Sequence, residues 1–254
     1  MIKIRNLLIK IRYVGTSYHG FQIQKNAVTI QEVFQKSLNT VLGYLPDIKG
    51  CSRTDSGVHA YEYALSTKIE SSIPERKLMT ALNHYLPKDV SVMSIVEVDE
   101  DFHARYSCLA KQYRYQIYNE SVMDPFLLGK ALQIKRNIDC ELLGEAALHF
   151  VGTNDFRPFS GNNNPDDNTV RTVYRFSVSR KGSLVSFLVV ADGFLYNMVR
   201  IMVGVLLEIN DNRLQIEDID RIFEGNTRTK RCITVPPVGL YLDRVFYSLG
   251  ELDE

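Results

Sequence analysis

The chain has 254 residues, 45% of them hydrophobic and 24% charged, and its thirty basic residues balance its thirty acidic ones. This composition is typical of a globular protein with a large core, and the neutral charge permits an RNA partner without favouring one. The start of the chain has no unbroken apolar stretch, and the run at 198–207 is interrupted by Arg200 and too short to cross a bilayer. We therefore expect a cytoplasmic protein without a membrane segment.

Hydrophobic periodicity in the N-terminal part predicts alternating strands and helices. Residues 7–13 alternate apolar and charged side chains, which predicts a half-buried strand. Thr29 followed by Glu32 predicts a capping box that opens a helix, and Gly43 predicts where this helix ends. Further along we expect a strand at 58–69, a helix at 74–85 and a strand at 90–98.

The C-terminal part predicts the same mixture of elements. Lys181 and Gly182 lie between two alternating segments, 170–180 and 183–192, which predicts a hairpin. The other expected elements are strands at 105–118 and 239–247 and helices at 140–150, 194–209 and 216–223.

This order of elements indicates an α+β fold made of two similar halves. We expect a mainly antiparallel sheet with helices on one side, and we place the halves at residues 1–104 and 105–254. The cysteines lie far apart and have no histidine at metal-ligand spacing, so we expect reduced thiols and no metal site. They are Cys51, Cys108, Cys140 and Cys232.

Asp55 lies in a short polar segment just before an expected strand, and it is the first candidate for chemistry. A structural turn is the ordinary interpretation of Asp-Ser-Gly, because these residues bond their own backbone or accept positive φ. The alternative is a carboxylate on a rigid loop beside Arg53, where it stays ionised and acts as a covalent nucleophile.

Arg200 is the second candidate, because it is the one charged residue between Leu195 and Leu207. A guanidinium in an apolar helix either extends to the surface or pairs with a carboxylate from elsewhere in the fold. Asp55 is a candidate partner for such a pair.

Tyr113 is the third candidate and lies on an expected strand. The two-residue period puts Tyr113, Tyr115 and Ile117 on one face, with Arg114 on the other. Tyrosines on a strand most often pack in a core, whereas the functional alternative is a platform for an extruded base with cations nearby for phosphate.

Taken together, these segments resemble the tRNA pseudouridine synthase A family over nearly the whole chain. No segment is specific alone, but all occur in the order that the family has. The matching segments are 13–24, 53–60, 102–105, 113–115, 155–156, 198–200 and 239–242.

The resemblance implies an enzyme that isomerises uridine to pseudouridine in the anticodon arm of tRNA, at positions 38 to 40, without metal or cofactor. It implies that Asp55 is the nucleophile, that Tyr113 stacks on the target base and assists proton transfer, and that Arg200 pairs with the aspartate. It also implies a pseudouridine synthase fold, with one continuous sheet through both halves, and a homodimer.

We expect the RNA contacts in and beside the matching segments. The candidates are Phe21, Gln22, Arg53, His59, His103, Arg105, Lys111 and Arg114. The chain departs from the common family pattern at Val14, Phe21, Ser52, Ser56 and Gln112. These differences leave Asp55, Tyr113 and Arg200 intact, but they leave open a relative that acts on ribosomal or another RNA.

Two alternatives of other classes also stay open at this point. One is an RNA-binding protein on the same scaffold that has no activity. The other is an unrelated carboxylate hydrolase such as a glycosidase, for which the sequence indicates no second acidic residue opposite the first.

Overall fold

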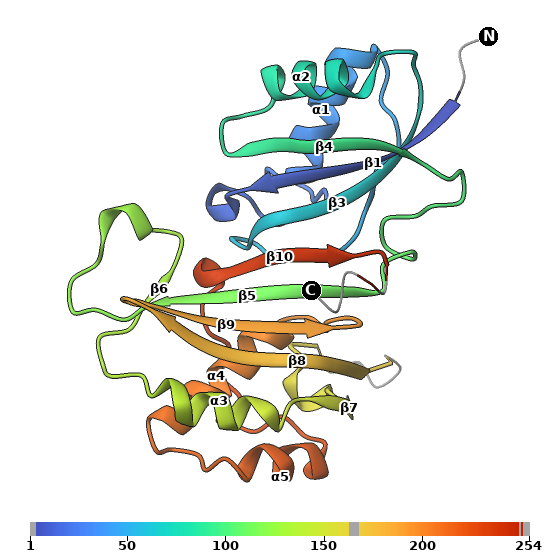
Figure 1. Ribbon diagram of the computed structural model, residues 1–254. Helices are drawn as coiled ribbons and strands as arrows, with labels where there is room; N and C mark the ends of the chain where they lie inside the picture. Colours follow the sequence, from blue (N-terminus) through green and yellow to red (C-terminus); the bar gives the residue numbers. More distant parts are fainter. Residues whose placement is uncertain (1–3, 163–167, 249, 251–254) are drawn as a thin grey trace. The chain divides into compact units, whose positions relative to one another are not determined.

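The computed structural model describes residues 4–162, 168–248 and 250, and the chain divides into two compact units. One unit comprises Met1–Leu109 with Tyr241–Glu254, and the other comprises Ala110–Leu240. The expected α+β class with mainly antiparallel pairing is confirmed within these units (Figure 1). The last strand of the chain, expected at 239–247, falls mostly in the first compact unit. The division into halves at 1–104 and 105–254 stays a prediction.

The first unit contains a sheet of strands in the order β4-β1-β3-β10, with β2 paired to β3. Strand β1 pairs antiparallel with both β3 and β4, whereas β10 runs parallel to β3 and aligns Tyr241 with His59. Helices α1 and α2 pack on each other, and α2 packs on β4. The bounds are β1 Ile4–Tyr13, α1 Ile30–Leu42, β2 Lys49–Gly50, β3 His59–Glu70, α2 Glu75–Tyr85, β4 Val90–Val98 and β10 Leu240–Phe246, with a 3-10 turn at Gly15–Ser17.

The second unit contains strands in the order β5-β9-β8-β7, with the short β6 paired to β5. Helix α3 packs on β8 and on α4, and α4 also contacts β5. The bounds are β5 Ala110–Tyr118, β6 Leu132–Gln133, α3 Cys140–Leu148, β7 Gly152–Asp155, β8 Val170–Lys181, β9 Leu184–Ala191, α4 Met198–Asn210 and α5 Asp218–Gly225. Short 3-10 turns lie at Pro125–Leu127, Arg157–Phe159 and Pro237–Gly239.

The predicted caps of the first helix are confirmed. The Glu32 backbone N–H donates to Thr29 Oγ1 at 3.3 Å, and Gly43 ends the helix in the left-handed region with φ of 78°. The Glu32 carboxylate has its pKa lowered mainly by Lys36 one turn later, and the backbone N–H of Thr29 adds to the effect. Local sequence therefore determines both ends of α1.

Two elements begin several residues later than predicted. The strand expected at 105–118 begins only at Ala110, because residues 102–107 form a turn in which the Ser107 N–H bonds the His103 carbonyl at 2.9 Å. The helix expected at 194–209 begins at Met198, because Asn197 takes a left-handed conformation with φ of 61°.

Among the described residues, no helix is both long and apolar enough to cross a membrane.

Candidate active site

Asp55 lies in a tight turn that leads into β3. The Asp55 carbonyl accepts the Val58 backbone N–H at 3.2 Å, and Gly57 between them has φ of 77°, a region in which a side chain is strained. The Asp55 residue is half-buried. The turn interpretation and the nucleophile interpretation are therefore compatible, since the turn fixes the backbone from which the carboxylate projects.

The loop that follows β1 holds this turn from outside through main-chain hydrogen bonds. The Thr54 carbonyl accepts the Phe21 N–H at 3.2 Å, and the Tyr18 carbonyl accepts the Gly57 N–H at 3.1 Å. Ser56 Oγ donates to the same Tyr18 carbonyl at 3.4 Å. These bonds join the first two matching segments of the sequence, 13–24 and 53–60, because the first segment holds the turn that the second one forms.

Buried tyrosines add two further ties to the same segment. Tyr13 Oη and Thr54 Oγ1 are 2.8 Å apart in the core, and Tyr63 Oη donates to the Ser52 carbonyl at 2.5 Å. The Phe21 ring stacks on Tyr63 with ring centroids 4.2 Å apart. Phe21 is only 4% exposed, so in this conformation its ring supports the loop.

Gly15 and His59 lock the loop to the start of β3. A Cβ at Gly15 would lie 1.9 Å from the Val58 carbonyl oxygen, a distance that no side chain can accept. The Gly15 N–H donates to His59 Nδ1 at 3.0 Å, and the His59 ring stacks on Tyr241 with centroids 4.6 Å apart. His59 is 1% exposed, so its position is that of a support and not of a ring open to RNA.

Tyr18 forms a further contact between the loop and the turn just before β4. Its hydroxyl donates to Asp89 Oδ1 at 2.6 Å. Burial, followed by this hydrogen bond to the carboxylate, raises the pKa of Tyr18 well above its usual value. The hydroxyl therefore stays protonated and keeps its donor role.

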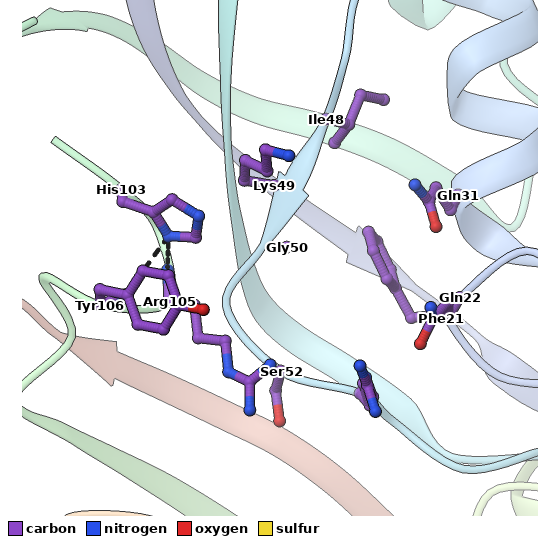
Figure 2. Close-up of a pocket in the computed structure, with 11 residues that line it drawn as sticks. Phe21, Gln22, Gln31, Ile48, Lys49, Gly50, Ser52, His103, Arg105 and Tyr106 are labelled. Carbon is purple, nitrogen blue, oxygen red and sulfur yellow. Dashed lines mark hydrogen bonds between the residues drawn. The ribbon is translucent and has the colours of Figure 1, made fainter. Parts of the chain in front are cut away.

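A pocket in the first unit gathers five of the eight residues predicted to contact RNA. Gln22, Arg53 and Arg105 in this group are exposed, His103 is half-buried, and Phe21 forms part of the wall. The pocket has a cavity volume of about 310 Å³. Figure 2 shows the residues that line it. The lining residues are Phe21, Gln22, Gln31, Ile48, Lys49, Gly50, Ser52, Arg53, His103, Arg105 and Tyr106.

In the second unit, the predicted alternation along β5 is confirmed. Tyr113, Tyr115 and Ile117 are buried on one face, while Arg114 is half-buried on the other. Lys111 lies two residues before Tyr113, so it falls on the same face of the strand, and it is half-buried. The Tyr113 ring meets Phe194 edge-on, with centroids 4.9 Å apart and an interplanar angle of 76°.

Arg200 lies on α4 and is anchored to the segment that precedes β10. Its Nε donates to the Val235 carbonyl at 2.8 Å, and its Nη1 donates to Asn197 Oδ1 at 2.7 Å. Tyr115 Oη donates to the neighbouring Pro236 carbonyl at 2.7 Å. Burial raises the pKa of Tyr115 far above its usual value, against the opposing effect of the Arg200 charge. The guanidinium is therefore held by several bonds in a part-buried position.

The matching pair at 155–156 has a structural place in this unit. The Asp155 carboxylate accepts Thr169 Oγ1 at 2.5 Å, the Arg157 backbone N–H at 3.0 Å and Asn226 Nδ2 at 3.2 Å. Burial opposes ionisation, but these donors lower the pKa of Asp155 in sum. Phe156 is fully buried beside Phe223.

Sequence reasoning missed part of the pocket. Tyr106 follows Arg105 directly and could have been found by extending the matching segment by one residue. Lys49 carried no signal, because it lies in a two-residue strand that no periodicity reveals. Gln31 lies on the predicted helix face next to apolar residues and was likewise not distinguished.

In the part of the chain that the structure describes, no three His, Cys, Asp or Glu side chains gather in a way that could hold a metal ion. All four cysteines are free thiols.

The family described as tRNA pseudouridine synthase matches residues 9–107 and 146–248 of this chain. A tRNA pseudouridine synthase A of Thermoanaerobacter sp. (strain X514) is 40% identical over 244 residues, covering 96% of this chain and 100% of that protein. A protein of the same name from Staphylococcus saprophyticus subsp. saprophyticus is 36% identical over 246 residues, covering 97% of this chain and 92% of that protein. The chain therefore belongs to the tRNA pseudouridine synthase family.

Among solved structures, a crystal structure of a Cbf5-Nop10-Gar1 complex aligns with a TM-score of 0.34 and 10% sequence identity. The alignment covers 79% of this chain and 53% of the matched chain, about half of its length.

Proposed function

We propose that this protein isomerises uridine to pseudouridine in the anticodon arm of tRNA, at positions 38 to 40, with Asp55 as the nucleophile. Membership of the tRNA pseudouridine synthase family supports the reaction and the tRNA substrate. The single structural observation that supports the role of Asp55 is the turn that carries it. Main-chain hydrogen bonds hold this turn, so the backbone that carries the Asp55 carboxylate is fixed in place.

The reaction begins with a uridine flipped out of the RNA stack. An Asp55 carboxylate oxygen bonds to C1′ of the ribose, while the C1′–N1 bond breaks and leaves its electron pair on N1 of the uracil. The free uracil turns so that C5 faces C1′. A new C5–C1′ bond then forms as the bond to Asp55 breaks, a base removes the proton from C5, and N1 takes up a proton.

Tyr113 and Arg200 have separate roles in this mechanism. Tyr113 provides a ring for the uracil to stack on, and stacking of a base on an aromatic ring contributes about 1–3 kcal/mol. The role of Arg200 that the family resemblance implies is to keep Asp55 ionised, because a guanidinium paired with a carboxylate stabilises its charged form. The fixed hydrogen bonds of Arg200 support a positioning role for it.

The test is release of tritium from uridine labelled at C5, in anticodon arms that each hold one labelled uridine. We expect release when the uridine is at position 38, 39 or 40, and none when it is elsewhere in the arm. Release from ribosomal RNA fragments and from no tRNA arm would contradict the proposed substrate. RNA binding without release from any substrate would contradict the enzymatic role.

We also propose a cytoplasmic homodimer, which rests on the family resemblance. Light scattering after gel filtration is expected to give twice the 29.1 kDa of one chain. A mass of one chain at micromolar concentration would contradict the dimer.

A further inference from the structure

The pocket in the first unit does not include Asp55, and its walls have the chemistry of a second nucleotide site. In the view of Figure 2, His103, Arg105 and Tyr106 lie on one side of the short β2 strand, with Phe21, Gln22 and Gln31 on the other. A volume of about 310 Å³ lies at the lower end of the range for small-molecule sites.

The turn that carries Arg105 and Tyr106 is fixed by hydrogen bonds from its backbone N–H groups to two side chains, those of His103 and Ser66. The N–H groups of both residues donate to His103 Nδ1, at 3.1 and 3.3 Å. The Ala104 N–H donates to Ser66 Oγ at 3.0 Å. Because Nδ1 accepts, Nε2 is the ring nitrogen that carries the proton, and His103 offers one N–H donor from a fixed ring.

Tyr106 is a large aromatic side chain that this rigid turn keeps in solvent. It is 79% exposed, and the His103 ring lies beside it, with ring centroids 4.4 Å apart. The Arg105 guanidinium is 5.9 Å from the Tyr106 centroid. An exposed ring on a fixed backbone beside a cation is the arrangement on which single-stranded nucleic acid stacks its bases.

Cations occupy the remaining polar positions of the pocket. Lys49, Arg53 and Arg105 line it, and none of its described lining residues is acidic. Asp47 pairs with Lys49 at 2.6 Å, but the two side chains are 72% and 51% exposed, so this pair is weak. A phosphate can therefore replace Asp47 as the partner of Lys49 at small cost.

We propose that this pocket binds one unpaired nucleotide of the RNA substrate, separate from the uridine that reacts at Asp55. Its base stacks on Tyr106, and its phosphate is held by Lys49 Nζ, the Arg105 guanidinium and His103 Nε2. This proposal deepens the proposed function and rests on it, since it assigns a second point of contact for the same RNA.

Substitutions at the exposed positions test the site with little risk to folding. Tyr106→Ala is expected to raise the Kd for a tRNA anticodon arm about 5- to 100-fold, with KM raised in step and kcat little changed. The matched control is Tyr85→Ala, since Tyr85 is also an exposed tyrosine beside a histidine, at 53% exposure and 5.0 Å from His84. Tyr85 is not among the lining residues, and its variant is expected to bind as the wild type does.

The phosphate contact has its own test in anticodon arms that carry one uncharged methylphosphonate in place of a phosphate. At one position, we expect the methylphosphonate to weaken binding to the wild type more than to Lys49→Gln or Arg105→Gln, each of which has already lost one of the contacts to that phosphate. Each of these variants is also expected to lower the slope of log affinity against log salt by about 0.7. Lys77→Gln on α2, also exposed, is the control and keeps the wild-type response.

The outcomes separate this site from the proposed function. If the wild type releases no tritium, but Tyr106→Ala still weakens RNA binding, the proposed function fails and the nucleotide site stands. If the wild type is active, and Tyr106→Ala binds as Tyr85→Ala does with no position showing the methylphosphonate effect, the site is contradicted and the function stands. A fall in kcat at unchanged Kd and KM would also contradict a binding site.

Discussion

The loop that carries Asp55 and the helix that carries Arg200 place their polar side chains by different means. The Asp55 turn in the first unit is held by main-chain hydrogen bonds from the Phe21 and Gly57 N–H groups, with buried rings behind it. Arg200 in the second unit is held through its own side chain, by the Val235 carbonyl and Asn197. Its neighbours on α4 are buried apolar residues.

In the Asp55 turn, the side chain proposed for catalysis is not the group that holds the local structure. On α4, the Arg200 side chain has both roles. The main-chain bonds that hold the Asp55 turn do not involve the carboxylate, so we expect the turn to keep its backbone when that side chain is changed. The Arg200 side chain satisfies a carbonyl that would lose its partner if the guanidinium were removed. The following predictions test this contrast, in order of the expected loss in free energy of unfolding.

Gly15→Ala is expected to have the largest effect. The new Cβ would lie 1.9 Å from the Val58 carbonyl oxygen, so one of two backbone segments must move. We expect a loss of about 3 kcal/mol or more in free energy of unfolding, measured by urea titration, together with loss of turnover. Gly144→Ala on α3 is the control, because no atom lies within 4 Å of its Cβ, and it should change stability by about 1 kcal/mol at most. Equal effects of the two variants would contradict the tight contact.

Arg200→Lys is expected to come next. A lysine cannot reproduce both the Nε bond to Val235 and the Nη1 bond to Asn197, and leaving one partner unsatisfied costs about 1–3 kcal/mol. We expect this loss in urea titration and a fall in kcat of about 10²-fold or more. Arg221→Lys on α5, where the arginine is 71% exposed, should lie within about 0.5 kcal/mol of the wild type. A fully stable Arg200→Lys variant would contradict the dependence of the second unit's stability on the Arg200 side chain.

Tyr13→Phe should have a smaller effect. It removes the hydroxyl that contacts Thr54 Oγ1 at 2.8 Å in the core and leaves the ring in place. The expected loss is about 1 kcal/mol in thermal or urea unfolding, with turnover lowered less than tenfold. Tyr85→Phe, at an exposed position, is the matched control and should leave the unfolding midpoint unchanged. An unchanged midpoint for Tyr13→Phe would show that this tie does not hold the Asp55 segment.

Local patterns predicted much of the fold, and the errors have physical causes. The ends of α1 and the hairpin at Lys181 and Gly182 follow from caps and turn residues that act within a few positions. The start of α4 does not, because the left-handed Asn197 is part of a loop that also bonds Gly161 through the Tyr196 carbonyl. Such contacts are distant in sequence and leave no periodic trace.

The candidate site likewise depends on both local patterns and distant contacts. Asp55, Tyr113 and Arg200 were singled out by residue type, position and family resemblance, and their roles stay proposals. The burial of His59 could not be predicted, because it depends on packing against Tyr241 at the other end of the chain. Lys49 enters the pocket only because β2 pairs with β3, which no local pattern reveals.

Asp55→Asn tests the central claim most directly, because it should change stability least and activity most. The variant is measured for unfolding by urea, for binding to an anticodon arm, and for tritium release from C5-labelled uridine. Glu224→Gln, an exposed carboxylate on α5, is the control for loss of one charge. We expect unfolding within about 0.5 kcal/mol of the wild type, nearly intact binding, and turnover lowered at least about 10³-fold. Turnover near the wild-type level in a folded Asp55→Asn variant would contradict Asp55 as the nucleophile.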